Sequence, residues 1–350
     1  MVAVSIFVTL ARGLARIVPN VFKDAFIILE IYVLAAITII QEFFYELTRS
    51  KAYRTLIEKI LESRFIKQRL EQWRPEYPVV VISGADGTIG EKFVRLLLKL
   101  NFAVFALAGN AQKFRTATAD LPSKERARVK VFQLDFTEPL RARRYMQTLV
   151  DKLGEVDMVI LAAGTMLAPA KEVLGVEHHC WVNVISQCAL LRMLESHLVG
   201  DARVIALSSV CSHMAEIDEC PNDLLLKNTL GMHEAYARSK LLLSIFCEQL
   251  AQEWTAKSVE LSVVSAHPGV VSGGLYRHTS FLIRYLVEKM VAAALMMSTA
   301  VRDDIHSGSY YEDEVPIKLR PDISEEKRHQ IFELINARVT DFVKGERIAN

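Results

Sequence analysis

SGADGTIG, at residues 83–90, directly follows the apolar run VVVIS at residues 79–83 and leads into a segment with helical character at Glu91–Leu100. Glycines at three positions in this stretch allow a tight turn, a close approach of the backbone to a ligand, and the packing of a helix against a strand. The first amides of such a helix carry a partial positive charge and bind phosphate groups. The stretch therefore predicts a strand–turn–helix unit that holds the pyrophosphate of a dinucleotide.

Further apolar runs of strand length follow this unit, with helical stretches between them. These runs are Ala103–Ala108, Val129–Leu134, Met158–Ala162, Val204–Ser208 and Leu261–Ala266, and a second clear helical stretch is Leu241–Trp254. Strands that are apolar on both faces and are separated by helical crossovers form a parallel sheet covered on both sides. The predicted fold class is α/β, a doubly wound parallel sheet of the Rossmann type in a single domain.

Composition and charge limit the classes of function. A chain of 350 residues with 51% hydrophobic residues buries a large core, which excludes a disordered chain or a disulfide-framed miniprotein. The 42 Lys and Arg residues balance 41 Asp and Glu residues, so no nucleic-acid partner is predicted. The five cysteines are spread out without a CxxC pair, and we expect reduced thiols in a cytosol-facing protein. His178-His179 precedes Cys180, but no further ligand follows at metal-binding spacing, so no metal site is predicted.

Residues 1–48 are far more apolar than the rest of the chain. The stretch AFIILEIYVLAAITII at 25–40 contains one charged residue, Glu30. A membrane-spanning helix needs ~20 apolar residues, and the stretch approaches that length only by including the aromatic residues that follow Glu42. A cleavable signal peptide is excluded because the charges follow the first apolar run. We expect residues 1–48 to attach the protein to a membrane, either across the bilayer or within one face of it; packing of residues 25–73 on the soluble domain is the alternative.

Residues 49–76 form a predicted basic linker. Residues 49–74 contain eight basic and three acidic residues, and apolar residues recur among them at helical spacing. This pattern indicates a basic amphipathic helix. Basic residues just after an apolar segment mark the cytoplasmic side of a membrane. We therefore expect a catalytic domain at 77–350 that faces the cytosol, on the endoplasmic reticulum membrane or a lipid droplet.

The segment YARSK, from Tyr236 to Lys240, opens a predicted long helix. A tyrosine and a lysine four residues apart lie on the same face of a helix. The ammonium group stabilises the phenolate, which brings the tyrosine proton within reach of exchange with an alcohol near neutral pH. Ser208-Ser209 ends one predicted strand and His267-Pro268-Gly269 follows another, so this chemistry is expected at the carboxyl ends of the strands.

Together these motifs resemble the short-chain dehydrogenase/reductase superfamily over residues 77 to about 345. The stretches HPGVVSGGLYRH (267–278), SGSYYED (307–313) and the helical tail at 325–342 resemble its retinol-dehydrogenase-like branch. The resemblance implies that Tyr236 is the acid/base, that Lys240 lowers its pKa, that Ser209 orients the substrate oxygen and that Asn183 supports a water relay. It also implies NAD or NADP as the cofactor. The residues implied to bind it are Ser83, Gly84, Asp86, Gly87, Thr88, Ile89, Gly90, Asn110, Asp135, Ala163, Gly164, Tyr236, Lys240, Pro268, Gly269 and Ser272.

The preference between NAD and NADP stays open, because the second predicted strand ends in Ala108-Gly109-Asn110, with neither an acid nor an arginine. Two departures from the family pattern affect the cofactor site. The usual pair of asparagines reads Leu161-Ala162, and a usual threonine is Gly273. The proton-transferring residues are intact.

The substrate is expected to be a lipid alcohol or aldehyde. The apolar stretch at 275–297 predicts the lid of a groove for a long apolar alcohol, and a helical cap over the core is the alternative. The insertion SHMAEIDECPNDLL at 212–225 resembles members of the branch that act on polyprenol, which implies polyprenol oxidation and dolichal reduction in dolichol synthesis. A retinol or steroid dehydrogenase and a cofactor-binding scaffold with little catalysis are the other hypotheses, and a homodimer is compatible with the resemblance.

Overall fold

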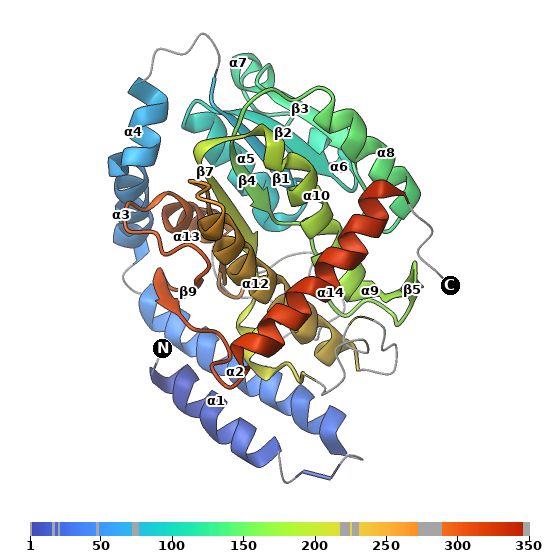
Figure 1. The fold of residues 1–350 in the computed structure, drawn as a ribbon. Helices are drawn as coiled ribbons and strands as arrows, with labels where there is room; N and C mark the ends of the chain where they lie inside the picture. Colours follow the sequence, from blue (N-terminus) through green and yellow to red (C-terminus); the bar gives the residue numbers. More distant parts are fainter. Residues whose placement is uncertain are drawn as a thin grey trace.

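A computed structural model of the protein describes residues 2–15, 18–19, 22–46, 49–71, 77–217, 225, 231–271 and 289–345. Its centre is an eight-stranded sheet with the order β10-β9-β8-β7-β4-β1-β2-β3, and helices cover both faces (Figure 1). Neighbouring strands are parallel except for β9 and β10. The prediction of a mostly parallel sheet between helices is confirmed.

The six predicted strands are present because their apolar runs are mostly buried on both faces of the sheet, although β4 and β7 begin before the predicted residues. Their bounds are Val79–Ser83 (β1), Ala103–Ala108 (β2), Val129–Gln133 (β3), Val156–Leu161 (β4), Leu198–Leu207 (β7), Ser262–Ala266 (β8), Tyr310–Glu312 (β9) and Val315–Ile317 (β10). A separate small hairpin pairs Glu172–Val173 (β5) with Val176–Glu177 (β6). Sequence reasoning missed β9 and β10, since strands of three residues are too short to show an apolar pattern.

Two helical layers enclose the sheet, and each rests on its own cluster of buried apolar residues. One layer contains Arg49–Glu62 (α3), Arg64–Glu71 (α4), Thr88–Lys99 (α5), Ala111–Ala117 (α6), Ser123–Arg126 (α7) and Lys289–Val301 (α13). The other contains Pro139–Val150 (α8), His178–Cys180 (α9), Ser186–Leu194 (α10), Met232–Ala256 (α12) and Glu325–Lys344 (α14). Short helical turns lie at Trp181–Ile185 (η2), Glu195–His197 (η3) and Val210–Met214 (η4). Among the described residues, Cys180, Cys188, Cys211 and Cys247 are buried and form no disulfide.

Residues 289–297 correct the predicted substrate lid. They belong to α13, which packs against α5 and α3 on the face of the sheet opposite α12. Ala292, Met296 and Met297 are fully buried there. A helix that is apolar on every side fits such an enclosed position. The remainder of the predicted lid, residues 275–288, lies outside the described residues.

Two helices precede the elements that form and cover the sheet: Val2–Ala15 (α1) and Lys23–Glu46 (α2). They pack side by side at one end of the molecule, and α2 also contacts α12 and η4 (Figure 1). The face of α2 toward the domain buries Ile27, Ile31 and Leu34 at helical spacing. In the described part of the chain, no helix has both the length and the apolarity needed to cross a membrane.

The predicted basic helix is divided into α3 and α4 at Ser63, and its apolar face packs on the domain. Leu56 and Ile60 are buried against α13. The buried guanidinium of Arg69 forms ion pairs with Asp157 at 3.2 Å and Asp201 at 2.5 Å. Asp157 lies on β4 and Asp201 on β7, so these ion pairs fix α4 directly to the sheet.

Candidate active site

The predicted site residues gather at the carboxyl edge of the parallel sheet. The chain leaves β1 toward β2 on one side and later returns to β4 on the other side of β1. Crevices at such a reversal of strand order are where doubly wound folds bind their ligands. The glycine-rich turn leaves β1 at this edge, residues 162–164 leave β4, and Ser209 follows β7.

The glycine-rich turn is built so tightly that side chains are excluded from it. Gly84 has φ +65°, and a Cβ there would lie 2.6 Å from the Cα of Ala163. A Cβ on Gly90 would lie 2.1 Å from the carbonyl oxygen of Gly84. Helix α5 begins at Thr88, directly after Gly87. The first amides of a helix have no acceptor within it, so those of Thr88 and Ile89 are suited to bind phosphate oxygens.

Ser83 joins the turn to the strand that lacks the usual asparagines. Its hydroxyl accepts hydrogen bonds from the backbone amides of Ala162 and Ala163, at 3.0 and 3.1 Å, and donates to Gln187 at 2.7 Å. Ser83 is fully buried. The hydroxyl therefore links the glycine-rich turn after β1 to the loop after β4. The asparagine side chains that the family pattern has in this loop are not needed for that link.

The adenosine side of the site carries one acid and one base. The carboxylate of Asp86 accepts from the amides of Gly109 and Asn110, at 3.0 and 3.2 Å, and the ammonium of Lys113 lies 3.9 Å from it. The side chain of Asn110 caps α6 by accepting from the amide of Lys113. Opposite charges meet beside the expected ribose position, so the charge pattern favours neither NAD nor NADP.

The third strand contributes two further polar residues near this side. Gln133 accepts from the amide of Ala111 at 2.9 Å and donates to the carbonyl of Gly109, which fixes the loop after β2. Sequence reasoning missed Gln133, since a glutamine within an apolar strand has no local signature. The carboxylate of Asp135 accepts from the amide and hydroxyl of Thr137, at 2.8 and 2.7 Å, and so forms a tight turn.

Tyr236 and Lys240 lie in the first turns of α12 and are both buried. Burial raises the pKa of the Tyr236 hydroxyl, and a hydrogen bond with Ser209 opposes the rise. The Lys240 ammonium lies 5.9 Å from the centre of the Tyr236 ring and donates to the carbonyl of Leu207 at 2.8 Å. Burial lowers the pKa of Lys240 to about 8. The structure thus places a hydroxyl, a phenol and an ammonium group together at the end of β7.

Asn183 lies on η2, a short π-helical turn of a kind that often occurs at functional sites. Its side chain accepts from the amide of Thr165 at 2.7 Å and donates to the Ser239 hydroxyl at 2.8 Å. A Cβ on Gly164 would lie 3.2 Å from Asn183 Oδ1 and 3.3 Å from Lys240 Nζ. The side chains of Asn183 and Lys240 therefore both lie next to Gly164. This placement is compatible with the predicted water relay between the two residues.

The loop after β8 completes the described part of the site. Pro268 is buried, and Gly269 has φ +84°, a conformation that favours glycine. Ser272 lies outside the described residues. Sequence reasoning also missed a buried pair near this loop, His213 on η4 and Glu312 on β9, whose side chains lie 2.7 Å apart.

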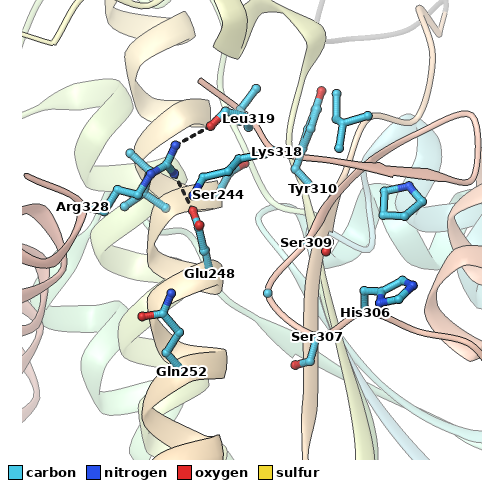
Figure 2. Close-up of a pocket in the computed structure, with 14 residues that line it drawn as sticks. Ser244, Glu248, Gln252, His306, Ser307, Ser309, Tyr310, Lys318, Leu319 and Arg328 are labelled. Carbon is cyan, nitrogen blue, oxygen red and sulfur yellow. Dashed lines mark hydrogen bonds and ion pairs between the residues drawn. The ribbon is translucent and has the colours of Figure 1, made fainter. Parts of the chain in front are cut away.

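A separate cavity of about 450 Å³ lies between α12, the loop before β9 and α14. Figure 2 shows Glu248 paired directly with Arg328, which is also bound to the carbonyl of Leu319. Ser244 and Tyr310 form its inner wall. Ser244 also donates to the backbone carbonyl of Lys240 at 3.1 Å, so the cavity lies behind the catalytic helix and does not include the site itself.

Parts of the chain are similar to known proteins. Residues 78–221 match the family model for short chain dehydrogenases. Retinol dehydrogenase 12 from Bos taurus is 30% identical over 209 residues, which cover 59% of this chain and 65% of that protein. Polyprenol dehydrogenase from Homo sapiens is 27% identical over 226 residues, which cover 62% of this chain and 67% of that protein. The chain thus spans slightly less than two thirds of the retinol dehydrogenase.

A solved structure of an uncharacterised protein from Mycobacterium paratuberculosis has the same fold. It superposes with a TM-score of 0.61 at 22% identity and covers 75% of this chain and 93% of its own. The family match coincides with the glycine-rich turn and Ser209, and the relatives extend it. The chain therefore resembles the short chain dehydrogenases, and retinol dehydrogenases and polyprenol dehydrogenase are among its relatives.

Proposed function

We propose that the chain is an NAD(P)-dependent oxidoreductase that interconverts a lipid alcohol and its aldehyde or ketone. The observation that carries the proposal is the convergence of Ser209, Tyr236 and Lys240 beside the glycine-rich turn. A phenol next to an ammonium group is suited to exchange a proton with an alcohol oxygen, and the adjacent turn is suited to a dinucleotide. A cofactor-binding scaffold without catalysis has no need for this arrangement.

The residues at the carboxyl edge fit a bound NAD(P). The amides at the start of α5 would hold the pyrophosphate, and Lys240 would hold the nicotinamide ribose. A bound cofactor would supply hydride transfer from the alcohol carbon in oxidation and to the carbonyl carbon in reduction. In oxidation, ionised Tyr236 accepts the hydroxyl proton of the alcohol; in reduction, neutral Tyr236 donates it. Lys240 stabilises the phenolate, and the hydroxyl of Ser209 holds the substrate oxygen in place.

Within lipid alcohols, we propose a polyisoprenoid as the substrate, with polyprenol and dolichal as the species to test. Support comes from the polyprenol dehydrogenase among the relatives and from the apolar helix α2, which packs on η4 and on the catalytic helix. Retinol is the second candidate, because retinol dehydrogenases are relatives of similar identity. A steroid alcohol is the third.

We further propose that residues 1–48 attach the enzyme to a membrane and that residues 49–76 join this segment to a catalytic domain at 77–350. Exposed large apolar side chains on and beside α1 and α2 support attachment. These are Leu10, Leu14, Phe22, Ile28, Leu29 and Ile40. Helices that lie in a membrane interface present apolar side chains of this kind to the lipid.

A substrate screen tests the proposed function. The full chain in detergent is supplied with polyprenol, all-trans-retinol or a steroid alcohol, and NAD and NADP are compared separately. We expect polyprenol to be the best substrate and short water-soluble alcohols to be poor. Far faster turnover of retinol or a steroid would replace the polyisoprenoid proposal, and no turnover in either direction would favour the scaffold.

The orientation is tested on intact microsomes. We expect added protease to digest the catalytic domain, because the proposal places it on the cytosolic side of the endoplasmic reticulum or on lipid droplets. Full protection of the domain would place it in the lumen and contradict this part of the proposal.

A further inference from the structure

A second group of polar side chains lies at the carboxyl edge of the sheet, next to the proposed catalytic residues. Glu312 ends β9, and the parallel register of β8 and β9 places it beside His267. From η4, the Nε2 of His213 lies 2.7 Å from Glu312 Oε1. The side chains of this pair are 11% and 9% exposed, so water has little access to it. The proton chemistry assigned to Tyr236 and Lys240 uses neither residue.

The short helix η4 connects the pair to Tyr236. Ser209 is the residue that caps η4: its hydroxyl accepts from the amide of Cys211 at 3.2 Å, and its carbonyl accepts from the amide of Ser212 at 3.0 Å. The same hydroxyl lies close enough to Tyr236 to act against the rise in the pKa of its phenol. Because η4 is only five residues long, a contact that holds His213 in place also holds Ser209.

Other titratable groups face the pair from three elements, and burial keeps them neutral. Tyr310 on β9 lies edge-on to His213, with ring centres 6.0 Å apart. Burial lowers the pKa of His267 to about 4 and raises those of Tyr310 and Cys211. For Glu312, burial acts to raise the pKa, but the hydrogen bond with His213 and the charge interactions with His213 and His267 together lower it. Glu312 is therefore ionised at neutral pH, and its charge is directed at η4.

We propose that Glu312 and His213 are positioning residues for the reaction. Glu312 anchors η4 through His213, and η4 in turn sets the position of the Ser209 hydroxyl relative to Tyr236. The inference deepens the proposed function, since it concerns the same site. It predicts that loss of the Glu312 carboxylate disturbs η4 first and turnover as a consequence, while cofactor binding at the glycine-rich turn, which follows β1 and makes no contact with Glu312, is spared.

Hydrogen exchange tests the anchoring without any need for turnover. In Glu312→Ala, we expect the amides of the peptide that spans 208–214 to exchange at least about tenfold faster than in the wild type. The matched control is Glu177→Ala, which removes the carboxylate of another buried pair, Glu177 and His179, whose atoms lie 2.8 Å apart. The control should leave exchange in 208–214 unchanged. Equal protection in Glu312→Ala and wild type would overturn the inference.

Kinetics test the consequence for the reaction. Displacement of a substrate-orienting group by about 1 Å costs about 100-fold in rate, so we expect kcat of Glu312→Ala to fall about 10- to 100-fold, with KM and the cofactor Kd within about twofold of wild type. Glu312→Gln keeps an oxygen that accepts from His213 and should recover most of the rate. It also serves as the folded variant if Glu312→Ala is unstable.

The outcomes separate the two proposals. If the wild type turns over no alcohol or aldehyde, the proposed function fails, and hydrogen exchange alone decides whether Glu312 anchors η4. If kcat per folded protein falls equally in Glu312→Ala and Glu177→Ala, the His213–Glu312 pair is only structural and the positioning role is wrong.

Discussion

The hydroxyl of Tyr236 is the atom on which the proposed proton transfer depends. Tyr236→Phe removes it and leaves the buried ring, so the fold and the cofactor site should be preserved. We expect turnover to fall ~10²–10⁴-fold, the usual cost of losing a general acid or base, while NAD(P)H binding measured by fluorescence stays near wild type. Tyr145→Phe, on the more exposed helix α8, is the control. Wild-type turnover in Tyr236→Phe would contradict the assignment.

We expect the buried charge of Lys240 to lower the free energy of unfolding at neutral pH. Its pKa falls from 10.5 to about 8 on burial, so the folded state binds fewer protons than the unfolded state between about pH 8 and 10.5, and stability rises with pH across that window. At neutral pH the buried charge costs about 3 kcal/mol.

Replacement of Lys240 by an apolar side chain of similar length should therefore separate stability from activity. We expect Lys240→Met to abolish turnover and to raise the free energy of unfolding in urea at pH 7 by about 2 kcal/mol, after loss of the hydrogen bond to Leu207. The gain should shrink by pH 10. A less stable Lys240→Met at pH 7 would show that the ammonium stabilises the native state.

At the scale of single residues, the sequence predicts what is local. Tyr236 and Lys240 are one helical turn apart, so their spacing alone indicates a shared face. His213 and Glu312 are 99 positions apart and meet only because β9 lies beside β8. No pattern within either stretch indicates that contact. The hydrogen bonds of Ser83 to the loop after β4 could not be predicted either. A hydroxyl at the start of a glycine-rich turn is equally typical of a phosphate contact.

Helix α2 has apolar residues on the side that packs on the domain and also on the side that is exposed to solvent. Ile31 is buried against the domain, whereas Leu29 is 59% exposed. If the open face binds lipid, Leu29→Asp should lower the affinity for vesicles by about tenfold or more, since burial of one leucine side chain contributes about 1.5–3 kcal/mol. Sedimentation with liposomes measures this effect.

The matched substitution on the other face separates attachment from folding. Ile31→Asp places a charge in the contact with the domain and should lower the thermal midpoint, whereas Leu29→Asp should leave it unchanged. Equal vesicle binding by wild type and Leu29→Asp would exclude this face as the attachment surface.

The sequence predicts a helix or strand correctly where its hydrophobic pattern fits only one kind of structure. The bounds of β1 and β2 agree with the apolar runs to the residue, because glycine and polar residues end both strands. Residues 289–297 show the opposite case. A run that is apolar on every side suits a substrate lid as well as a core helix, and only the contacts with α3 and α5 decide between them.

The C-terminal helix α14 holds together parts of the chain that are far apart in sequence, since it packs on both α10 and α12. Its buried Arg328 donates to the carbonyls of Leu319 and Arg320 and forms an ion pair with Glu248. Arg328→Met leaves these acceptors without a donor, and removal of one partner of a buried pair costs about 3–5 kcal/mol. We expect a large fall in the urea midpoint. Arg141→Met, at an exposed ion pair with Glu138, should change it little. Similar midpoints in both variants would contradict this role.

The reactivity of the buried thiols reports how fast the structure around each of them opens. Burial raises the pKa of Cys180, Cys188, Cys211 and Cys247, so each sulfur is unreactive until the structure around it opens. Alkylation by a maleimide, followed peptide by peptide, would therefore time four separate openings in a single sample. We expect Cys211, on the short helix η4, to be modified before Cys247, which lies deep in α12. Simultaneous modification of all four would instead mean that the protein opens only as a whole.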